Sequence, residues 1–196
     1  MRKTILLIAL IALPGGAYAQ SAAEPFTGFH AGPAIGAVDH HFVLEESTSG
    51  GPIRQFNVTR WGIGGEGFAG YDLAVTQKIV VGAEAAFDFG GRSAIESNRD
   101  YTFGIVPRHG FSLSVRPGYK AGSRVLLYAG GGFGGHDYRV VDSASSAADS
   151  DMTHTRSFIL RGGAEYAFSR RGRVRFEFQH LDGTRNLFML GFPFRF

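Results

Sequence analysis

Histidine is the residue of this 196-residue chain best suited to metal chemistry, because the chain has no cysteine. His40 and His41 are adjacent, while His136 and His154 stand at the two ends of a polar stretch. A structural metal site needs three or four ligands that converge, and these histidines are scattered. We therefore expect them to lie in solvated loops and expect no metal and no cofactor.

His180 is the remaining candidate for acid–base chemistry, as the general base of a hydrolase. The chain around it reads Phe178-Gln179-His180-Leu181-Asp182. A histidine base activates a nucleophile only when a hydroxyl or thiol lies beside it, and Asp182 offers neither. The tract therefore predicts no catalytic residue, and we expect a protein that is not an enzyme.

Single charges of both signs recur on one face of several alternating segments. From Arg173 to Gln179, for example, Val174, Phe176 and Phe178 share one face, and charged or polar residues occupy the other. Buried charges persist only when they are paired, so such faces predict a cross-linked polar network inside a narrow lumen. The predicted network comprises Glu66, Glu84, Asp88, Arg116, Arg161, Glu165, Arg175, Glu177 and Arg195.

The elements that must position this network are strands, because apolar residues recur with a period of two along most of the chain. Glycine supplies 29 residues and phenylalanine 18, and this glycine content disfavours a helical bundle. The glycines from Val125 to Gly135 leave the facing of that segment open. The eight expected strands are Phe29–Val38, Trp61–Leu73, Val81–Phe89, Phe111–Tyr119, Val125–Gly135, Phe158–Phe168, Arg173–Gln179 and Leu187–Phe196.

The connections between these strands alternate in length. Three are tight turns, and three others are long and polar, namely Asp39–Thr59, Gly90–Gly104 and Asp137–Thr155. Short turns at one end and long loops at the other favour an all-β, eight-stranded antiparallel up-and-down transmembrane barrel. A soluble lipocalin-like cup, the alternative, needs a consistently apolar interior, which the charged face contradicts.

The first nineteen residues have the pattern of a secretory signal peptide. Arg2 and Lys3 precede an apolar run from Ile5 to Leu13, and Ala17 and Ala19 supply the small residues of a cleavage site. We therefore assign 1–19 to a signal peptide and 20–196 to the barrel. Removal of the two basic residues lowers the formal charge from +3 to +1, so we expect no nucleic-acid partner.

The end of the chain resembles the C-terminal signal of bacterial outer-membrane barrels. Phe188, Leu190, Phe192, Phe194 and Phe196 occupy every second position up to the last residue. The resemblance implies delivery by periplasmic chaperones and recognition of this strand by the barrel-assembly machinery. The segments 65–71, 163–166 and 175–178 are similar to the opacity/OmpA-like porin family, which implies eight strands and residence in the bacterial outer membrane, beside its lipid and lipopolysaccharide.

The family does not imply one activity. We expect a monomer with a plugged polar lumen that serves envelope integrity or binds a host or other surface ligand through its long extracellular loops. A small-solute pore is one alternative. The other is a lipid A-modifying enzyme, because the tract around His180 is similar to that of lipid A 3-O-deacylases, in which a nucleophilic Ser follows the His by two residues. Asp182 stands at that position here and disfavours it.

Overall fold

The computed structural model describes residues 25–46, 54–97, 102–142, 152–181, 183 and 185–196. The expected signal peptide, with Ala17 and Ala19, lies outside these residues, and so does Asp182. Among the described residues there is no helix long and apolar enough to cross a membrane.

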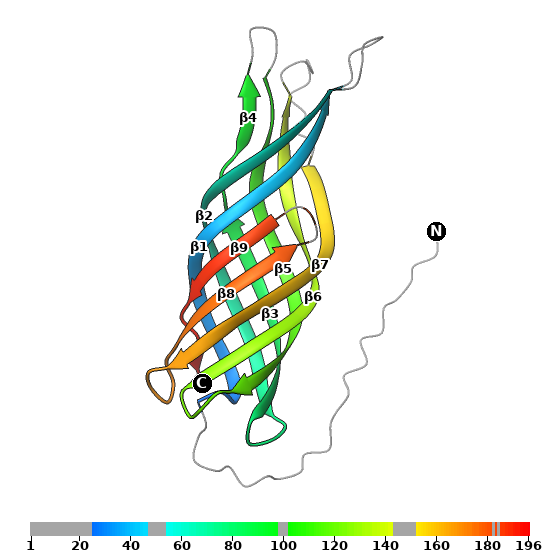
Figure 1. Ribbon diagram of the computed structural model, residues 1–196. Coiled ribbons are helices and arrows are strands. Elements are labelled where there is room, and N and C mark those ends of the chain that lie inside the picture. The colour runs from blue at the N-terminus through cyan, green and yellow to red at the C-terminus, as the bar shows by residue number, and fades with distance from the viewer. Residues whose placement is uncertain (1–24, 47–53, 98–101, 143–151, 182, 184) are drawn as a thin grey trace, which may run out of the picture.

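Strands make up almost all of the described chain (Figure 1). They are β1 (Gly28–Glu46), β2 (Arg54–Ala74), β3 (Ile79–Gly90), β4 (Ala94–Ser97), β5 (Thr102–Lys120), β6 (Val125–Asp142), β7 (Met152–Ala167), β8 (Arg173–Leu181), β9 (Arg185–Gly191) and β10 (Phe194–Arg195).

These segments close into one antiparallel barrel. Each strand pairs with its neighbours in chain order, and β1 pairs with β9 and β10 to close the ring. β4 continues β3 along the same edge of β5, and β10 continues β9 along β1, so the described segments form an eight-stranded barrel. The expected fold class is therefore confirmed.

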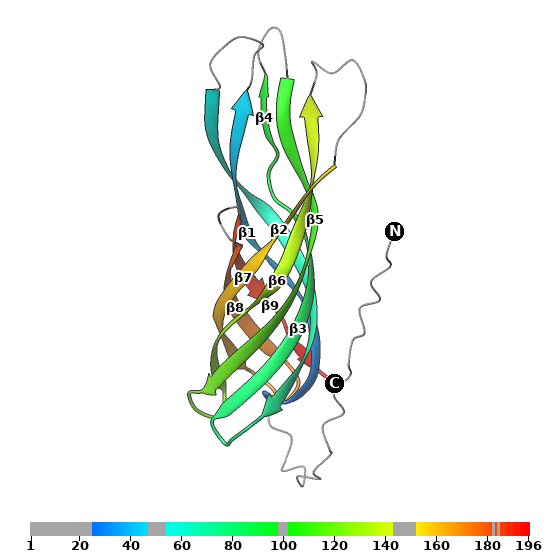
Figure 2. The same ribbon diagram turned by 90° about the vertical axis from the view of Figure 1, so that its right-hand side faces the viewer.

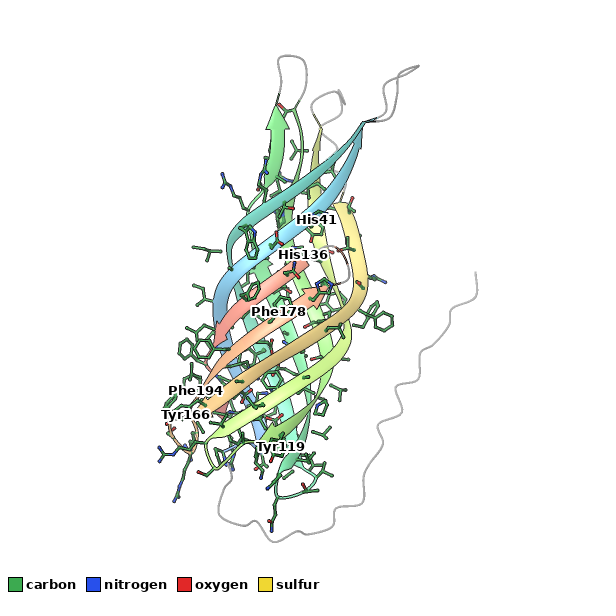
Figure 3. All side chains as sticks on the ribbon, in the orientation of Figure 1. His41, Tyr119, His136, Tyr166, Phe178 and Phe194 are labelled. Carbon is green, nitrogen blue, oxygen red and sulfur yellow. The ribbon has the colours of Figure 1, made fainter. Side chains whose placement is uncertain are left out.

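Large apolar side chains cover the outside of the barrel and alternate with inward residues along each strand, as β3 and β8 show most regularly. Figure 3 labels Phe178 on this outer surface, and Tyr119, Tyr166 and Phe194 near the end with the short turns. Exposed apolar residues include Phe29, Ile35, Trp61, Ile63, Tyr71, Phe87, Phe89, Phe111, Leu113, Val115, Leu127, Phe133, Phe158, Leu160, Phe168, Phe176, Phe188 and Phe196. An outer band of this kind is what a lipid bilayer requires of a barrel.

The facing of β6 is decided by its large residues. Leu126 and Tyr128 are buried inside the barrel, whereas Leu127 and Phe133 are about half exposed outside it. The next inward positions after Tyr128 are Gly130, Gly132 and Gly134, and a Cβ at Gly132 would overlap the carbonyl oxygen of Leu113. Glycine is therefore required there by the close approach of the neighbouring strand.

The strands extend well beyond their expected ends. β1 has 19 residues and β2 has 21, whereas about 9–11 residues of a tilted strand cross a bilayer. Most of the described residues in the three expected loops are therefore strand, and the expectation of long irregular loops was wrong for them. Figure 2 shows these extensions, with β4, at the end of the barrel opposite the short turns.

The alternation does not mark the extensions as strands, because their apolar residues do not alternate with polar ones; Phe42, Val43 and Leu44, for example, are consecutive in β1. Above the membrane the outer face contacts water, so the apolar alternation that marks a strand inside lipid disappears, while backbone hydrogen bonds continue the pairing. β8 and β9 are short, with 9 and 7 residues, so the extension is confined to one side of the barrel. At its base, Gly90 and Gly91 adopt positive φ angles of 96° and 100° where β3 gives way to β4.

Candidate functional site

The lumen of the barrel is occupied by side chains arranged in layers along its axis. Phe26, Val80, Leu126 and Ala167 form an apolar layer at the end with the short turns. A charged layer follows, and beyond it Val38, Phe68, Ile159, Leu187 and Met189 belong to a second apolar layer. A third polar cluster lies above that layer, toward the strand extensions.

Arg116 and Arg173 hold one side of the charged layer together. The guanidinium of Arg116 donates to Glu165 Oε1 at 2.6 Å and to both oxygens of Asp72 at 2.9 and 3.0 Å. Arg173 lies 2.8 Å from Glu165 Oε2 and 3.4 Å from Asp72. His30 bridges Asp72 and Glu84 through its two ring nitrogens. All these groups are almost fully buried.

Arg161 and Arg175 join the other side of the layer. Arg161 donates to Glu84 Oε1 at 2.9 Å and to Glu177 Oε1 at 2.6 Å. Arg175 donates to the two oxygens of Glu84 at 2.9 and 2.7 Å and to Glu165 at 2.9 Å. Each of these arginines therefore contacts two carboxylates, which is the condition under which buried charges are tolerated.

Aromatic and amide groups complete the layer. Tyr128 donates its hydroxyl to Glu177, and Gln179 donates to Glu66 at 2.8 Å and to Glu177 at 2.7 Å. The guanidinium carbon of Arg175 lies 4.2 Å from the centre of the Phe68 ring, a cation–π geometry. The aromatic faces therefore contribute to holding the arginines where water is excluded.

The structure brings most of the predicted network residues together and separates two. Glu66, Glu84, Glu165 and Glu177 converge with Arg116, Arg161 and Arg175 in the charged layer. Asp88 lies higher and pairs with Arg185 at 2.6 Å and with His136 at 3.2 Å. Arg195 lies in β10 at the turn end, half buried and close to Gly28.

Two histidines expected in solvated loops lie inside the lumen instead. His40 and His136 are fully buried, and His40 Nδ1 lies 3.3 Å from the hydroxyl of Tyr138. They belong to strand extensions, so the pleat turns their side chains inward. His41 and His154 lie on the outer side, where His41 contacts Thr59 and His154 contacts Asp137. Within the described residues, no group of three potential ligands is arranged to hold a metal ion.

Sequence reasoning missed several members of the lumen. His30, Asp72, Arg173 and Gln179 occupy the polar parity of their strands, so alternation alone could have found them. Tyr128 was hidden by the glycines around it, whereas Phe68 shares the parity of Glu66 and Asp72 in β2 and is a lumen residue by the same alternation. The aromatic residues of the terminal motif all point outward, and their role in assembly stays a prediction.

A basic patch lies on the outer face of β5, β6 and β7, above the apolar band. Its exposed residues are Arg108, His109, Arg139, His154 and Arg156. Asp137 lies among them, 2.6 Å from His154 Nδ1 and 3.3 Å from His109 Nε2. The hydrogen bond from His154 lowers the pKa of the Asp137 carboxyl. One carboxylate among three arginines leaves the patch with a net positive charge.

A polar chain runs across the outer face of β8, β9 and β1. Asn186 Nδ2 donates to Asp39 Oδ2 at 3.2 Å, and Asn186 Oδ1 lies 2.7 Å from His180 Nδ1. The three residues are directly opposite one another in the strand register. This outer chain, His180–Asn186–Asp39, contains no hydroxyl or thiol nucleophile.

Comparison with known proteins agrees with this architecture. Residues 6–195 match the family described as the outer membrane protein beta-barrel domain. The chain belongs to this family. Proteins of this family are barrels of the bacterial outer membrane. In such barrels the short turns face the periplasm, so the strand extensions face the exterior. No curated protein matches the chain.

Solved structures with the same fold include two small surface barrels. Ail, the attachment invasion locus protein of Yersinia pestis, is 17% identical, with a TM-score of 0.52 over 87% of this chain and 99% of its own. The neisserial surface protein A is 12% identical, with a TM-score of 0.50 over 86% of this chain and 96% of its own. A second structure of Ail contains the heparin analogue sucrose octasulfate and has 16% identity, a TM-score of 0.50, and coverage of 86% and 99%. At these identities the likeness concerns the fold.

Proposed function

We propose that this outer-membrane barrel is a surface-binding protein that is not an enzyme and that conducts no bulk solute through its lumen. The observation that carries the proposal is the division of the molecule into a side-chain-filled lumen and a basic patch on the strand extensions. The first favours a scaffold over a channel. The second presents charge to the exterior.

The filled lumen argues against the small-solute pore. Arg116, Arg161, Arg173 and Arg175 contact carboxylates on strands that are not their neighbours in the sheet, and apolar layers lie above and below them. A continuous water path would have to break several of these buried pairs, each costing about 3–5 kcal/mol. Planar-bilayer recording of the purified barrel should show no large stable single channels, and their appearance would contradict this part of the proposal.

The ligand that fits the basic patch is an anionic saccharide with sulfate or phosphate groups. Arg108, Arg139 and Arg156 come from three adjacent strands and are exposed above the apolar band. Arginine matches the geometry of such oxyanions with two parallel hydrogen bonds. The heparin analogue in the structure of Ail is a precedent for this ligand class on the same fold.

Calorimetric titration of the detergent-solubilised barrel with sucrose octasulfate tests the proposal. The double variant Arg139→Gln/Arg156→Gln should bind about threefold to tenfold more weakly, since each exposed ion pair is worth about 0.2–1 kcal/mol. Binding should also weaken with added salt, because exposed charges are screened.

Arg170→Gln/Arg171→Gln is the matched control, because these two arginines are exposed in the periplasmic turn after β7. It removes the same charge from the opposite end and should leave binding unchanged. Equal loss in both double variants would indicate a response to net charge alone and would overturn the assignment to this patch.

A further inference from the structure

A row of directly paired residues crosses the outer face of six strands, and one of them is a histidine beside an open groove. Directly paired residues along it are Gly131 of β6, Leu160 of β7, His180 of β8, Asn186 of β9 and Asp39 of β1. Trp61 of β2 pairs with Asp39 and is half exposed. A tryptophan at this height is typical of the membrane interface, so the row lies near the outer-leaflet boundary.

A groove of about 640 Å³ opens on the outer face where the row crosses β6 to β8. Its lining residues include the rings of Phe133 and Phe158, the side chain of Leu160, and His180. Gly131 has no side chain to fill the space between the two aromatic rings and the histidine. The groove is thus apolar along its length and has one polar group, His180, at its edge.

The hydrogen bonds of the outer chain fix which ring nitrogen of His180 carries the proton. Asn186 uses its amide nitrogen to donate to Asp39, so its carbonyl oxygen faces His180. A carbonyl oxygen only accepts, so His180 Nδ1 is the donor. In the neutral ring Nε2 is then an acceptor, and within the described residues it makes no hydrogen bond.

We propose that this groove binds one acyl chain of an outer-leaflet lipid and that His180 Nε2 accepts a hydrogen bond from a hydroxyl or amide N–H near that chain. The apolar walls suit the hydrocarbon, and the lipid environment of the outer band supplies it. The acceptor adds a chemical preference that a bare apolar groove lacks.

This preference separates two classes of lipid. Glycerophospholipids join their chains through esters, whose oxygens accept hydrogen bonds but cannot donate them. Lipid A carries amide-linked, hydroxylated chains, which donate. The occupant we assign is therefore a lipid of the lipid A type. The inference does not rest on the proposed saccharide binding, because none of the lining residues of the groove belongs to the basic patch.

Native mass spectrometry of the detergent-solubilised barrel tests the inference, with lipid A and phosphatidic acid as the two probes. Both probes are anionic, but only lipid A has amide and hydroxyl donors on its chains. The wild type should bind lipid A in preference. His180→Phe keeps a ring of similar size without the acceptor and should weaken lipid A binding about tenfold, leaving phosphatidic acid unchanged.

Two further variants separate the hydrogen bond from the groove. Gly131→Leu fills the groove and should weaken binding of both lipids, whereas Tyr166→Phe removes an outer hydroxyl at the periplasmic end and should change neither. A heat-shift gel confirms that each variant is folded before binding is measured. Equal binding of the two probes, or lipid A binding that survives His180→Phe, would overturn the proposal.

Discussion

The lumen network and the outer chain are both polar groups in apolar surroundings, yet they end differently. Inside, each of the four arginines contacts two carboxylates of the protein. Outside, the chain from Asp39 through Asn186 stops at His180, whose Nε2 makes no hydrogen bond within the described residues. A network whose charges are all paired within the protein stabilises the fold. A network that ends at an acceptor without a partner can bind a ligand.

The two regions also differ in how they affect the stability of the protein. Buried ions lose their hydration, and only close pairing with opposite charges compensates for that loss. A single substitution in the lumen should therefore have a large effect on the stability of the barrel. In the outer chain Asp39 is buried, but His180 at its end lines the groove on the outer surface. Substitutions of His180 should therefore affect ligand binding more than stability.

The largest effect is expected from Arg175→Ala. This change leaves Glu84 and Glu165 buried without one of their cations, which should destabilise the barrel by about 3–5 kcal/mol. Urea unfolding of the barrel in lipid vesicles measures the loss, and a heat-shift gel should show a lower transition temperature. Arg170→Ala in the periplasmic turn is the exposed control, and an equal response of the two variants would contradict the pairing.

A smaller loss is expected from Tyr128→Phe. The change removes the hydroxyl that donates to Glu177, and a hydrogen bond to a charged group is worth about 1.5–3 kcal/mol. The same unfolding experiment measures it. Tyr166→Phe, on the outer face of β7, removes an exposed hydroxyl and should have no comparable effect; if it did, the loss at Tyr128 would not report on the lumen.

The His180 end of the outer chain should contribute little to stability. His180→Phe places an apolar side chain on the lipid face, and we expect a change within about 0.5 kcal/mol. Urea unfolding under the same conditions provides the number. A loss as large as that of Tyr128→Phe would remove the distinction between the two regions, since the outer chain would then be structural as well.

The smallest effect is expected at Asp137 in the basic patch. Its pKa in the folded protein is lowered by the hydrogen bond from His154, so its stabilising contribution is present above the unfolded pKa of about 3.9 and disappears as the pH falls through the folded value. Heat-shift temperatures measured from pH 5 down to pH 2 should decline slightly more for the wild type than for Asp137→Asn. Identical profiles would show that this bond contributes nothing.

Alternation along the chain was sufficient to predict the barrel, because the pleat of a strand sends successive side chains to opposite faces. It identified the outward phenylalanines of the last strand and the inward charges such as Glu84 and Arg161. It failed for the strand extensions, where apolar residues such as Phe42, Val43 and Leu44 are consecutive rather than alternating. It also failed for the glycine-rich part of β6, where glycines carry no facing signal. His40 and His136 were misplaced for the first of these reasons.

The sequence alone determined the facing of most residues in the regularly alternating parts of the strands, and it required that the inward charges be paired. Only the tertiary structure decided the partners. Arg175 meets Glu84, which is 91 residues away in the chain, and the outer chain forms because β9 pairs with β1 in one register. Whether a side chain faces the lumen is a local property of the strand backbone. Which side chains meet across the barrel depends on strand tilt and register, which are set only when the sheet closes.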